Sequence, residues 1–302
     1  MGNKQYTGEI SNHKITILIT GANGQLGSEI RQLSHNYSFY NFLFTSRDVL
    51  PIENSDVLNQ FFEKQKIDYC INCAAYTAVD KAETEREKAF HINGDAAGNL
   101  AKVCFNHQSK LIHISTDYVY DGTKHLPLKE EDPVAPLNIY GLSKLKGEEL
   151  VQGHYPGALI IRTSWVYSVY GNNFVKNMLR LFKEMESLNV VNDQLGCPTN
   201  GANLAGVIMK FIEGFENNNS YSGIVNYCNS GITTWFDFAL TIKEFVNSSC
   251  VIHPVSTEHY PTPAKRPKYS VLDTSKIKTM LHIEIPDWKE SLYKCLLTLQ
   301  EI

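Results

Sequence analysis

Short apolar runs alternate with helix-like segments through the first half of the chain. Residues 15–20, ITILIT, contain four aliphatic side chains and two threonines, which predicts a buried strand. Further strands are predicted at 42–45, 69–73, 111–115 and 158–162. Helix-spaced apolar positions predict helices at 25–33, 55–64, 85–106 and 140–151. Because strands and helices alternate with short connections, the sequence predicts an α/β fold with a doubly wound parallel sheet.

The second half of the chain is less regular. Helices are predicted at 173–186, 203–215, 236–246 and 288–299, and short strands at 190–191 and 224–227. Four prolines between 254 and 267 predict loops rather than sheet interior. We expect a first domain over 14–168, joined by a returning strand near 224–228, and a smaller, mainly substrate-binding α/β domain over 169–302. Residues 1–13 are polar and are expected to form a flexible tail.

Composition narrows the class of protein. The chain has 302 residues, of which 43% are hydrophobic and 20% charged, and a formal net charge of -4, so neither a basic nucleic-acid surface nor disorder is expected. No apolar run approaches the roughly 18 residues of a membrane span. Cys70 and Cys73 lie inside an apolar run and are expected to be buried, reduced thiols. With seven scattered cysteines and a polar N-terminus, we expect a cytoplasmic protein.

A glycine-rich turn follows the first predicted strand directly. The segment reads Gly21-Ala22-Asn23-Gly24-Gln25-Leu26-Gly27 and opens the first predicted helix. Glycines at such a position allow a tight turn and a close approach of the backbone to a pyrophosphate. The helix N-terminus supplies free N–H groups and partial positive charge. This context predicts a Rossmann-type dinucleotide-binding loop.

The end of the second predicted strand bears on cofactor choice. An acidic residue here typically binds a ribose 2′-OH, whereas an arginine suits a 2′-phosphate. The chain has Ser46 and Arg47, followed by Asp48. We therefore favour NADPH and leave NADH open; the alternative for Arg47 is a solvated surface arginine.

A Tyr-x-x-x-Lys pair follows the strand at 111–115. Tyr140 and Lys144 are four residues apart, which places both side chains on one helix face. A nearby ammonium lowers a tyrosine pKa and prepares it for proton exchange, so we expect Lys144 to lower the pKa of Tyr140. The hydroxyls of Ser115 and Thr116 end the preceding strand, where open α/β sheets bind ligands. In this order, the glycine loop, hydroxyl and Tyr-Lys pair predict hydride-transfer chemistry.

These motifs resemble the short-chain dehydrogenase/reductase superfamily, extended branch, and within it the reductases of 4-keto nucleotide sugars. The matching stretches cover most of the chain after residue 14: 21–27, 72–83 (NCAAYTAVDKAE), 93–97, 115–122 (STDYVYDG), 140–147 (YGLSKLKG), 162–167 (RTSWVY), 193–199 (DQLGCPT) and 266–275. The resemblance implies NAD(P)H-dependent reduction of the C4 ketone of dTDP-4-dehydro-6-deoxy-L-mannose. Alternatives are another nucleotide-sugar 4-ketoreductase or epimerase of this branch, or a non-catalytic cofactor-binding subunit.

The resemblance also implies roles for single residues. Tyr140 is the implied proton donor to the substrate oxygen, Lys144 holds the nicotinamide ribose, and Thr116 hydrogen-bonds the carbonyl. Asp117, Tyr118 and Trp165 are the implied sugar contacts. The alternative for Asp117 is a turn-forming residue, and the alternative for Trp165 is an ordinary core position.

The remaining implied contacts belong to the cofactor. Gly24, Gln25 and Leu26 match the pyrophosphate loop, and Ala75, Tyr76 and Thr77 match the segment under the cofactor ribose. Pro51-Ile52 stands where the family commonly has Asp and an apolar residue against adenine, so Ile52 is the expected adenine contact. His91 and His113 are expected to be packed or hydrogen-bonded rather than metal ligands.

No metal is expected for the chemistry. Some members of the family dimerise around a magnesium ion held by glutamates. Glu29 matches one of these, but Ala202 and Thr298 stand near the other two. We therefore expect a monomer or a weak, metal-independent homodimer, with a nucleotide-sugar substrate as its partner and neither nucleic acid nor membrane.

Overall fold

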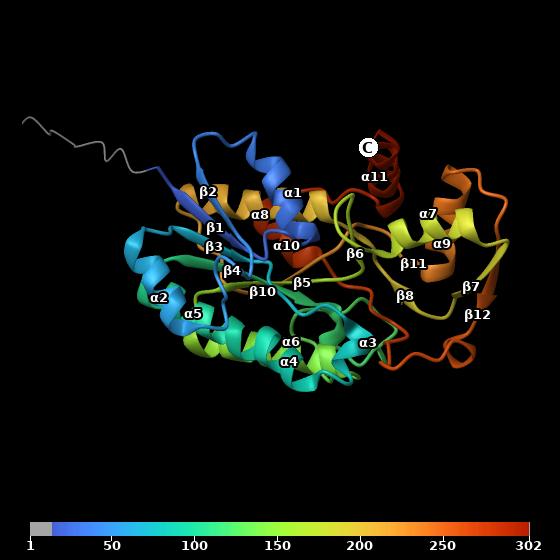
Figure 1. Cartoon of the computed structure of the whole chain (residues 1–302), viewed down its shortest axis with the longest axis horizontal. Helices are drawn as coiled ribbons and strands as arrows, with labels where there is room; N and C mark the ends of the chain where they lie inside the picture. The colour runs from blue at the N-terminus through green and yellow to red at the C-terminus, as the bar shows by residue number, and fades with distance from the viewer. Residues whose placement is uncertain (1–13, 302) are drawn as a thin grey trace, which may run out of the picture.

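A parallel six-stranded sheet forms the centre of the protein in the computed structural model, which describes residues 14–301 and the side chains of 14–300 (Figure 1). The tail expected at 1–13 lies outside these residues. The strands run in the order β2-β1-β3-β4-β5-β10. They are β1 (Thr16–Thr20), β2 (Asn41–Thr45), β3 (Tyr69–Asn72), β4 (Lys110–Thr116), β5 (Leu159–Thr163) and β10 (Gly223–Tyr227). Strand order reverses between β1 and β3, so a ligand crevice is expected at their carboxyl ends.

Helices cover both faces of this sheet (Figure 1). Alternation along β1 directs Ile17 and Ile19 into one core and Leu18 into the other. The first core packs against α1 (Gln25–Ser34), α8 (Gly201–Glu216) and α10 (Ser275–Leu281). The second packs against α2 (Ser55–Lys64), α5 (Ala96–Asn106) and α6 (Ile139–His154). The sheet is thus buried on both faces, which explains its near-continuous aliphatic strands.

The long helix predicted over 85–106 contains a wide turn. It consists of α4 (Arg86–Phe90), the π-helical segment η1 (His91–Asp95) and α5. The π turn inserts an extra residue per turn and changes which side chains face inward. Asn93 in this turn is buried, and it takes part in the site described below.

A smaller lobe follows the large sheet. Its core joins α7 (Phe174–Glu184), α9 (Trp235–Phe245), α11 (Trp288–Glu301) and the parallel pair β7 (Ser187–Val191) and β12 (Val251–Val255). Pro254 lies within β12, so the prediction of a loop at this position is wrong. A two-stranded sheet has only edge strands, and an edge strand tolerates a proline, which has no N–H group to donate. The chain after residue 168 contributes to both lobes, because α8, β10 and α10 pack on the large sheet. Short elements complete the chain: α3 (Val79–Ala82), η2 (Asp117–Val119), β6 (Val166–Tyr167), β8 (Leu195–Gly196), β9 (Thr199–Asn200), β11 (Thr233–Thr234) and η3 (Thr257–His259).

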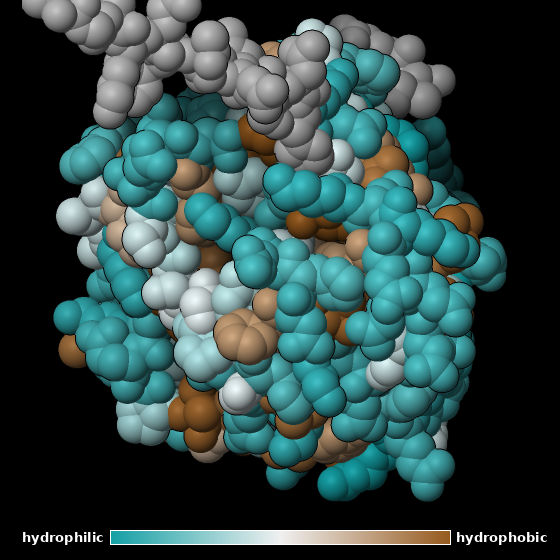
Figure 2. Space-filling model, turned by 90° about the vertical axis from the view of Figure 1, so that its left-hand side faces the viewer, coloured by the Kyte–Doolittle hydropathy of each residue, from teal (hydrophilic) through white to brown (hydrophobic). Residues whose placement is uncertain are grey.

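The surface at the β2 edge of the sheet is mainly polar. Figure 2 shows this side, with apolar residues in small, separate patches on the visible part. Scattered apolar residues of this kind are normal on a protein surface. Among the described residues, no helix is long and apolar enough to span a membrane.

Candidate active site

The glycine turn joins β1 to α1 at the point where strand order reverses. Gly21 has φ +64°, and a Cβ there would lie 2.6 Å from the Ala74 nitrogen. A Cβ on Gly27 would lie 2.6 Å from the Ala22 Cα. Gly24 is the N-cap of α1 and has no side chain to bond the first-turn N–H groups. The turn therefore presents free backbone donors, as an anion-binding helix N-terminus requires.

The predicted adenosine contacts follow the neighbouring strand β2. Ser46 is half-buried, and the Arg47 side chain is 65% exposed, with its Nε 2.7 Å from Glu53 Oε1. Ile52 is buried. The Ala22 N–H donates to the Thr45 carbonyl, so the end of β2 lies against the glycine turn. An exposed, singly paired arginine is free to exchange its carboxylate for a phosphate.

The segment 75–77 is held by Asn93 in the π turn. The Tyr76 N–H donates to Asn93 Oδ1 over 2.8 Å, and Asn93 Nδ2 donates to the Tyr76 carbonyl over 3.0 Å. Asn93 Nδ2 also lies 2.9 Å from Ser143 Oγ on α6. Ala75 is half-buried and Thr77 exposed. This role of Asn93 was not predicted from the sequence, because the apolar pattern over 85–106 is that of a regular helix. Nothing in that pattern indicates the π turn that directs Asn93 inward.

Helix α6 brings Tyr140 against the end of β4. Asn138 caps the helix by accepting the Gly141 N–H, and a Cβ on Gly141 would lie only 2.2 Å from the Tyr118 carbonyl oxygen. Without a side chain at 141, α6 packs closely on η2. The Tyr118 and Tyr140 rings meet edge to face at 5.7 Å, and the Thr116 hydroxyl lies close enough to Tyr140 to affect its pKa. The structure thus brings together residues that are 24 positions apart in the chain.

The expectation that Lys144 lowers the pKa of Tyr140 is wrong for this structure. Burial raises the pKa of Tyr140 to about 12, the nearby Thr116 hydroxyl lowers it in part, and the charge of Asp117 raises it. The Lys144 ammonium is directed elsewhere: its Nζ donates to the Ile114 carbonyl over 2.6 Å. Tyr140 is therefore protonated throughout the neutral range, which is the state that a proton donor needs.

Lys144 lies in a buried polar pocket of its own. Its side chain is 2% exposed, and its Nζ lies 3.4 Å from His113 Nε2. Burial lowers the pKa of Lys144 to about 8, while Glu148 and Cys73 raise it. His113 is buried and hydrogen-bonded, as expected, whereas His91 is exposed on the π turn.

Asp117 carries an unused acceptor beside Thr116. The Thr116 hydroxyl donates to Asp117 Oδ1 over 3.0 Å, but Oδ2 is buried and has no hydrogen-bond partner among the described residues. Burial raises the pKa of Asp117 to about 7, although the nearby hydroxyls of Ser270 and Thr116 lower it in part. An orphaned buried oxygen is costly unless a ligand satisfies it.

Trp165 stands where the two lobes meet. Its φ is +48°, its ring stacks on Trp235 with centroids 3.6 Å apart, and a Cβ on Gly196 would lie 2.6 Å from it. The ring is half-buried rather than enclosed in the core. An aromatic face held in a strained backbone conformation is consistent with a ligand contact.

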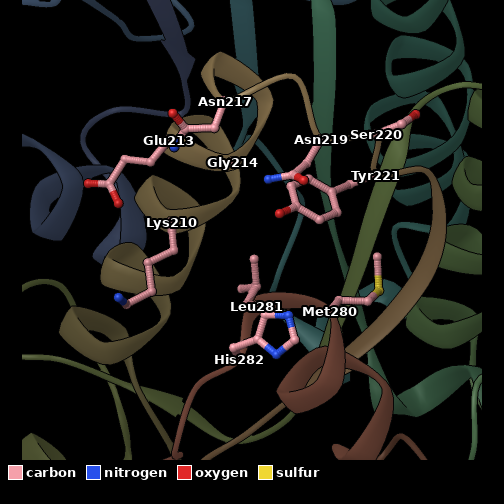
Figure 3. A pocket seen from close by; sticks show the side chains of 10 residues that line it. All are labelled: Lys210, Glu213, Gly214, Asn217, Asn219, Ser220, Tyr221, Met280, Leu281 and His282. Atoms are coloured by element: carbon pink, nitrogen blue, oxygen red, sulfur yellow. The ribbon is translucent and has the colours of Figure 1, made fainter.

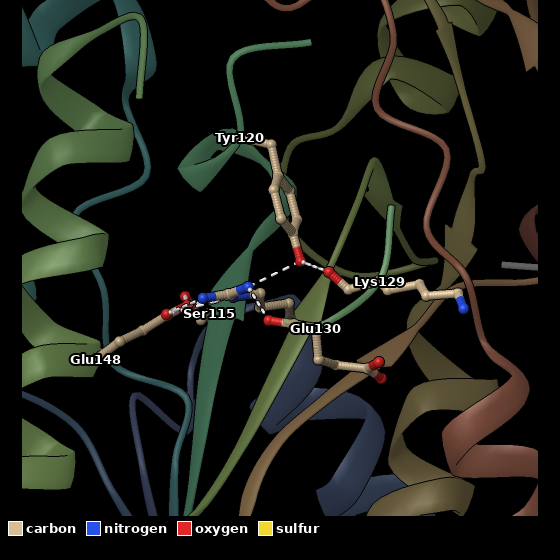
Figure 4. A network of polar contacts seen from close by, with 6 residues as sticks. Ser115, Tyr120, Lys129, Glu130 and Glu148 are labelled. Atoms are coloured by element: carbon tan, nitrogen blue, oxygen red, sulfur yellow. Dashed lines mark hydrogen bonds and ion pairs between the residues drawn. The ribbon is translucent and has the colours of Figure 1, made fainter. Parts of the chain in front are cut away.

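A buried ion pair supports the carboxyl end of β4 (Figure 4). Arg162 Nη2 lies 2.6 Å from Glu148 Oε2 on α6, and Arg162 Nη1 donates to the Tyr120 hydroxyl over 2.7 Å. Ser115 Oγ donates to Glu148 Oε1 over 2.5 Å. The network ties β4 and β5 to α6 and keeps Thr116 and Lys144 in register. Neither Arg162 nor Glu148 was predicted, since nothing in their spacing indicates that they meet.

Two hollows of the surface lie away from Tyr140. One, of about 340 Å³, lies between the end of α8 and α10 and includes Tyr221 and His282 (Figure 3). It adjoins the amino end of β10, whereas parallel sheets bind ligands at the carboxyl ends. The other, of about 420 Å³, is lined by Glu29, Ala202 and Thr298 together.

The second hollow does not fit a magnesium ion. Glu29 is its one lining carboxylate among the residues that the structure describes, and burial raises the pKa of Glu29. Lys294 also lines it. Magnesium requires oxygen ligands in octahedral geometry, usually with one or two carboxylates. Within residues 14–300, no group of three or more His, Cys, Asp or Glu side chains is placed to hold a metal ion.

The doubly wound sheet, the glycine turn and the Tyr140–Lys144 helix at one crevice define a member of the short-chain dehydrogenase/reductase class. A model of one family within it, described as the RmlD substrate binding domain, matches residues 15–301. The chain belongs to this family.

Named relatives cover nearly the whole chain. The chain is 38% identical over 283 residues to a dTDP-4-dehydrorhamnose reductase of Aggregatibacter actinomycetemcomitans, covering 91% of this chain and 96% of the relative. A solved dTDP-4-dehydrorhamnose reductase of Clostridium acetobutylicum is 41% identical, with a TM-score of 0.89 over 95% of this chain and all of that one. The enzyme of Bacillus anthracis, solved in complex with NADP, is 39% identical with a TM-score of 0.90 over the same shares.

Proposed function

We propose that this protein reduces the C4 ketone of dTDP-4-dehydro-6-deoxy-L-mannose and so forms dTDP-L-rhamnose, with NADPH as the favoured hydride donor. The observation that carries the proposal is the meeting of Tyr140 and Thr116 at the end of β4, beside a buried Lys144 and an uncapped glycine turn. The relatives named above, including one solved with NADP, support this substrate and cofactor.

Tyr140 and Thr116 are the proposed oxygen-binding pair. A ketone that accepts hydride develops negative charge on its oxygen, and donors aimed at that oxygen stabilise the transition state. The Thr116 hydroxyl lies close enough to Tyr140 to lower its pKa, so the two hydroxyls can reach one substrate oxygen. Because Tyr140 is protonated near neutral pH, it transfers its proton to the oxygen as the charge develops.

The cofactor fits the residues at the β1–β3 crevice. When bound, NADPH supplies the hydride. Gly21, Gly24 and Gly27, with Gln25 and Leu26, shape the proposed pyrophosphate site at the start of α1. Arg47 and Ser46 are the proposed 2′-phosphate contacts, Ile52 the adenine contact, and Lys144 with segment 75–77 the nicotinamide ribose contacts.

The sugar site is proposed between β4 and the smaller lobe. Asp117 Oδ2 is an acceptor without a partner among the described residues and suits a sugar hydroxyl. Tyr118 and Trp165 offer ring faces for the deoxysugar. We therefore propose residues 14–168 with 224–228 as the cofactor-binding unit and 169–302 as mainly substrate-binding.

The proposed setting is the cytoplasm, without nucleic-acid or membrane partners. All seven cysteines are free thiols, and six of them are buried, which suits a reducing compartment. A monomer or weak homodimer is proposed on the absence of a fitting ligand set around Glu29 within the described residues.

Substrate specificity is tested by NADPH oxidation at 340 nm. The purified protein is given dTDP-4-dehydro-6-deoxy-L-mannose and, separately, other 4-keto nucleotide sugars that differ in base or sugar. We expect turnover with the first substrate and formation of dTDP-L-rhamnose. Higher turnover with another ketosugar would reassign the substrate, and NADPH binding without turnover of any of them would favour a non-catalytic role.

A further inference from the structure

A chain of buried polar side chains crosses the sheet and ends at Lys144. Thr20 Oγ1 donates to Asn72 Oδ1 over 2.7 Å, and Asn72 Nδ2 lies 3.0 Å from His113 Nδ1. His113 Nε2 in turn lies 3.4 Å from Lys144 Nζ. Asn72, His113 and Lys144 are each at most 2% exposed. The chain connects β1, β3 and β4 to α6, and water does not screen it.

The direction of each hydrogen bond follows from one backbone group. The Ala74 N–H donates to Asn72 Oδ1 over 3.2 Å. A backbone N–H only donates, so the atom facing it is the amide oxygen, and the other amide atom is the NH₂ group facing His113. His113 Nδ1 is therefore an acceptor. Burial and the charge of Lys144 hold the pKa of His113 well below its usual value, so the ring is neutral and its single proton is on Nε2.

This tautomer directs an N–H group at Lys144. An ammonium has only donors, whereas a neutral amine has a lone pair that accepts a hydrogen bond. We propose that His113 is a positioning residue: oriented by Asn72, its Nε2–H holds Lys144 Nζ against the Ile114 carbonyl and favours the neutral amine over the ammonium. This inference rests on the proposed function, because it concerns the lysine placed there at the cofactor ribose.

The titratable groups around Lys144 act in opposite directions. Glu148 on the same helix raises the pKa of Lys144, and Arg162 holds Glu148 in place. Cys73, which follows β3, would raise it only as a thiolate, and burial raises the pKa of the Cys73 thiol to about 12, so the thiol is neutral here. Tyr140, one turn earlier on α6, is neutral as well. His113 is thus the neighbour that faces Nζ with a donor, and the balance between ammonium and amine depends on its tautomer.

A matched pair of variants separates the two ring nitrogens. In His113→Asn, the amide retains a group at the Nδ1 position and removes the donor at Nε2. In His113→Gln, the longer side chain restores an N–H at the Nε2 position. NADPH affinity is measured against pH by fluorescence titration. Since the ammonium carries positive charge toward an anionic cofactor, affinity in the unchanged protein is expected to fall as pH rises through about 8.

The two variants are expected to differ in pH dependence. His113→Asn moves the midpoint of the NADPH titration up by about one pH unit, because the opposing donor is gone. His113→Gln keeps the midpoint of the unchanged protein. Equal shifts in both variants, or none in either, would overturn the proposal. This titration needs no ketosugar, so a wrong substrate assignment leaves its outcome intact.

A second measurement reads the tautomer without a substitution. Nitrogen-15 NMR of the histidine rings distinguishes Nε2–H from Nδ1–H, and the His113 signal is the one absent from the His113→Gln spectrum. We expect the Nε2–H form in the unchanged protein. In Asn72→Asp, a carboxylate replaces the amide donor and the proton is expected to move to Nδ1. An Nδ1–H or doubly protonated ring in the unchanged protein would contradict the proposal even if His113→Asn does not fold.

Discussion

At the scale of single residues, burial decides the chemistry more than the Tyr-x-x-x-Lys spacing does. The spacing of Tyr140 and Lys144 predicts that the two share a helix face, and they do so on α6. It does not predict their protonation states, which follow from desolvation and from hydrogen bonds to other elements. Burial keeps Tyr140 neutral and makes Lys144 easier to deprotonate.

The first prediction concerns Tyr140→Phe, which removes the proton donor and keeps the ring. General acid catalysis contributes about 10²–10⁴-fold, so kcat is expected to fall by that factor while NADPH affinity is retained. Tyr155→Phe is the control, since Tyr155 directly follows the end of α6 and is partly buried against the core. The measurements are NADPH oxidation and NADPH fluorescence titration. Near-normal turnover of Tyr140→Phe would reject the assignment.

The second prediction concerns Arg47→Ala. A charge-assisted hydrogen bond to a 2′-phosphate contributes about 1.5–3 kcal/mol, so NADPH affinity is expected to fall about tenfold or more. NADH lacks that phosphate and is expected to bind as before. Arg180→Ala is the matched control, because Arg180 is another exposed arginine paired with a glutamate. Equal losses for both cofactors would show that Arg47 does not contact the phosphate.

The third prediction concerns pH and Asp117. Its pKa in the folded protein, about 7, lies above the usual 3.8, so the folded state binds the proton more tightly than the unfolded state. The stability that this proton contributes is fully present below pH 4 and is lost as pH rises through about 7. The amide of Asp117→Asn does not titrate, so this variant does not lose stability in this way as pH rises. Thermal melting of both proteins should therefore show the Tm advantage of Asp117→Asn growing between pH 4 and 7, and a constant difference would argue against a buried, perturbed carboxyl.

At the scale of elements, close helix packing places the site. The sequence predicted α1, α2 and α6 to within three residues of their observed ends, because each has a regular apolar face. It did not predict the π turn around Asn93 or α10, since neither breaks or extends the apolar pattern visibly. The contact between α6 and η2 depends on Gly141, whose role is visible only once the Tyr118 carbonyl is seen against it.

The fourth prediction uses two glycines of α6. Gly141→Ala places a methyl group 2.2 Å from the Tyr118 carbonyl oxygen, so the helix must move and Tyr140 with it. A misplacement of about 1 Å at a catalytic group can cost about 10²-fold in kcat. Gly153→Ala, on the same helix, has open space around its new methyl group and is expected to stabilise the fold by about 1 kcal/mol. The prediction fails if both variants show the same kcat.

At the scale of the whole molecule, the second hollow bears on assembly. Glu29, Ala202 and Thr298 come from α1, α8 and α11, and the fold brings them to one cavity. These are the three positions that the family resemblance in the sequence compares with a magnesium ligand set. Two of them carry no carboxylate in this chain, so the ligand set is incomplete.

The fifth prediction is that chelation changes neither activity nor mass. Turnover and sedimentation are measured with and without EDTA, and then with added magnesium. Hydride transfer with Tyr140 as the acid needs no Lewis acid, so we expect equal rates and the same sedimentation coefficient throughout. Loss of rate or mass on chelation, restored by magnesium, would show that the metal binds after all.

The sequence alone determined the strands and most of the helices of the large sheet and the place of the glycine turn, and it predicted which residues carry the chemistry. These are local properties, set by side-chain periodicity and by the backbone freedom of glycine. Only the tertiary structure decided that Thr116 contacts Tyr140, that His113 faces Lys144 and that Asp117 Oδ2 lacks a partner among the described residues. Desolvation and long-range hydrogen bonds depend on which elements pack together, and spacing along one chain does not contain that information.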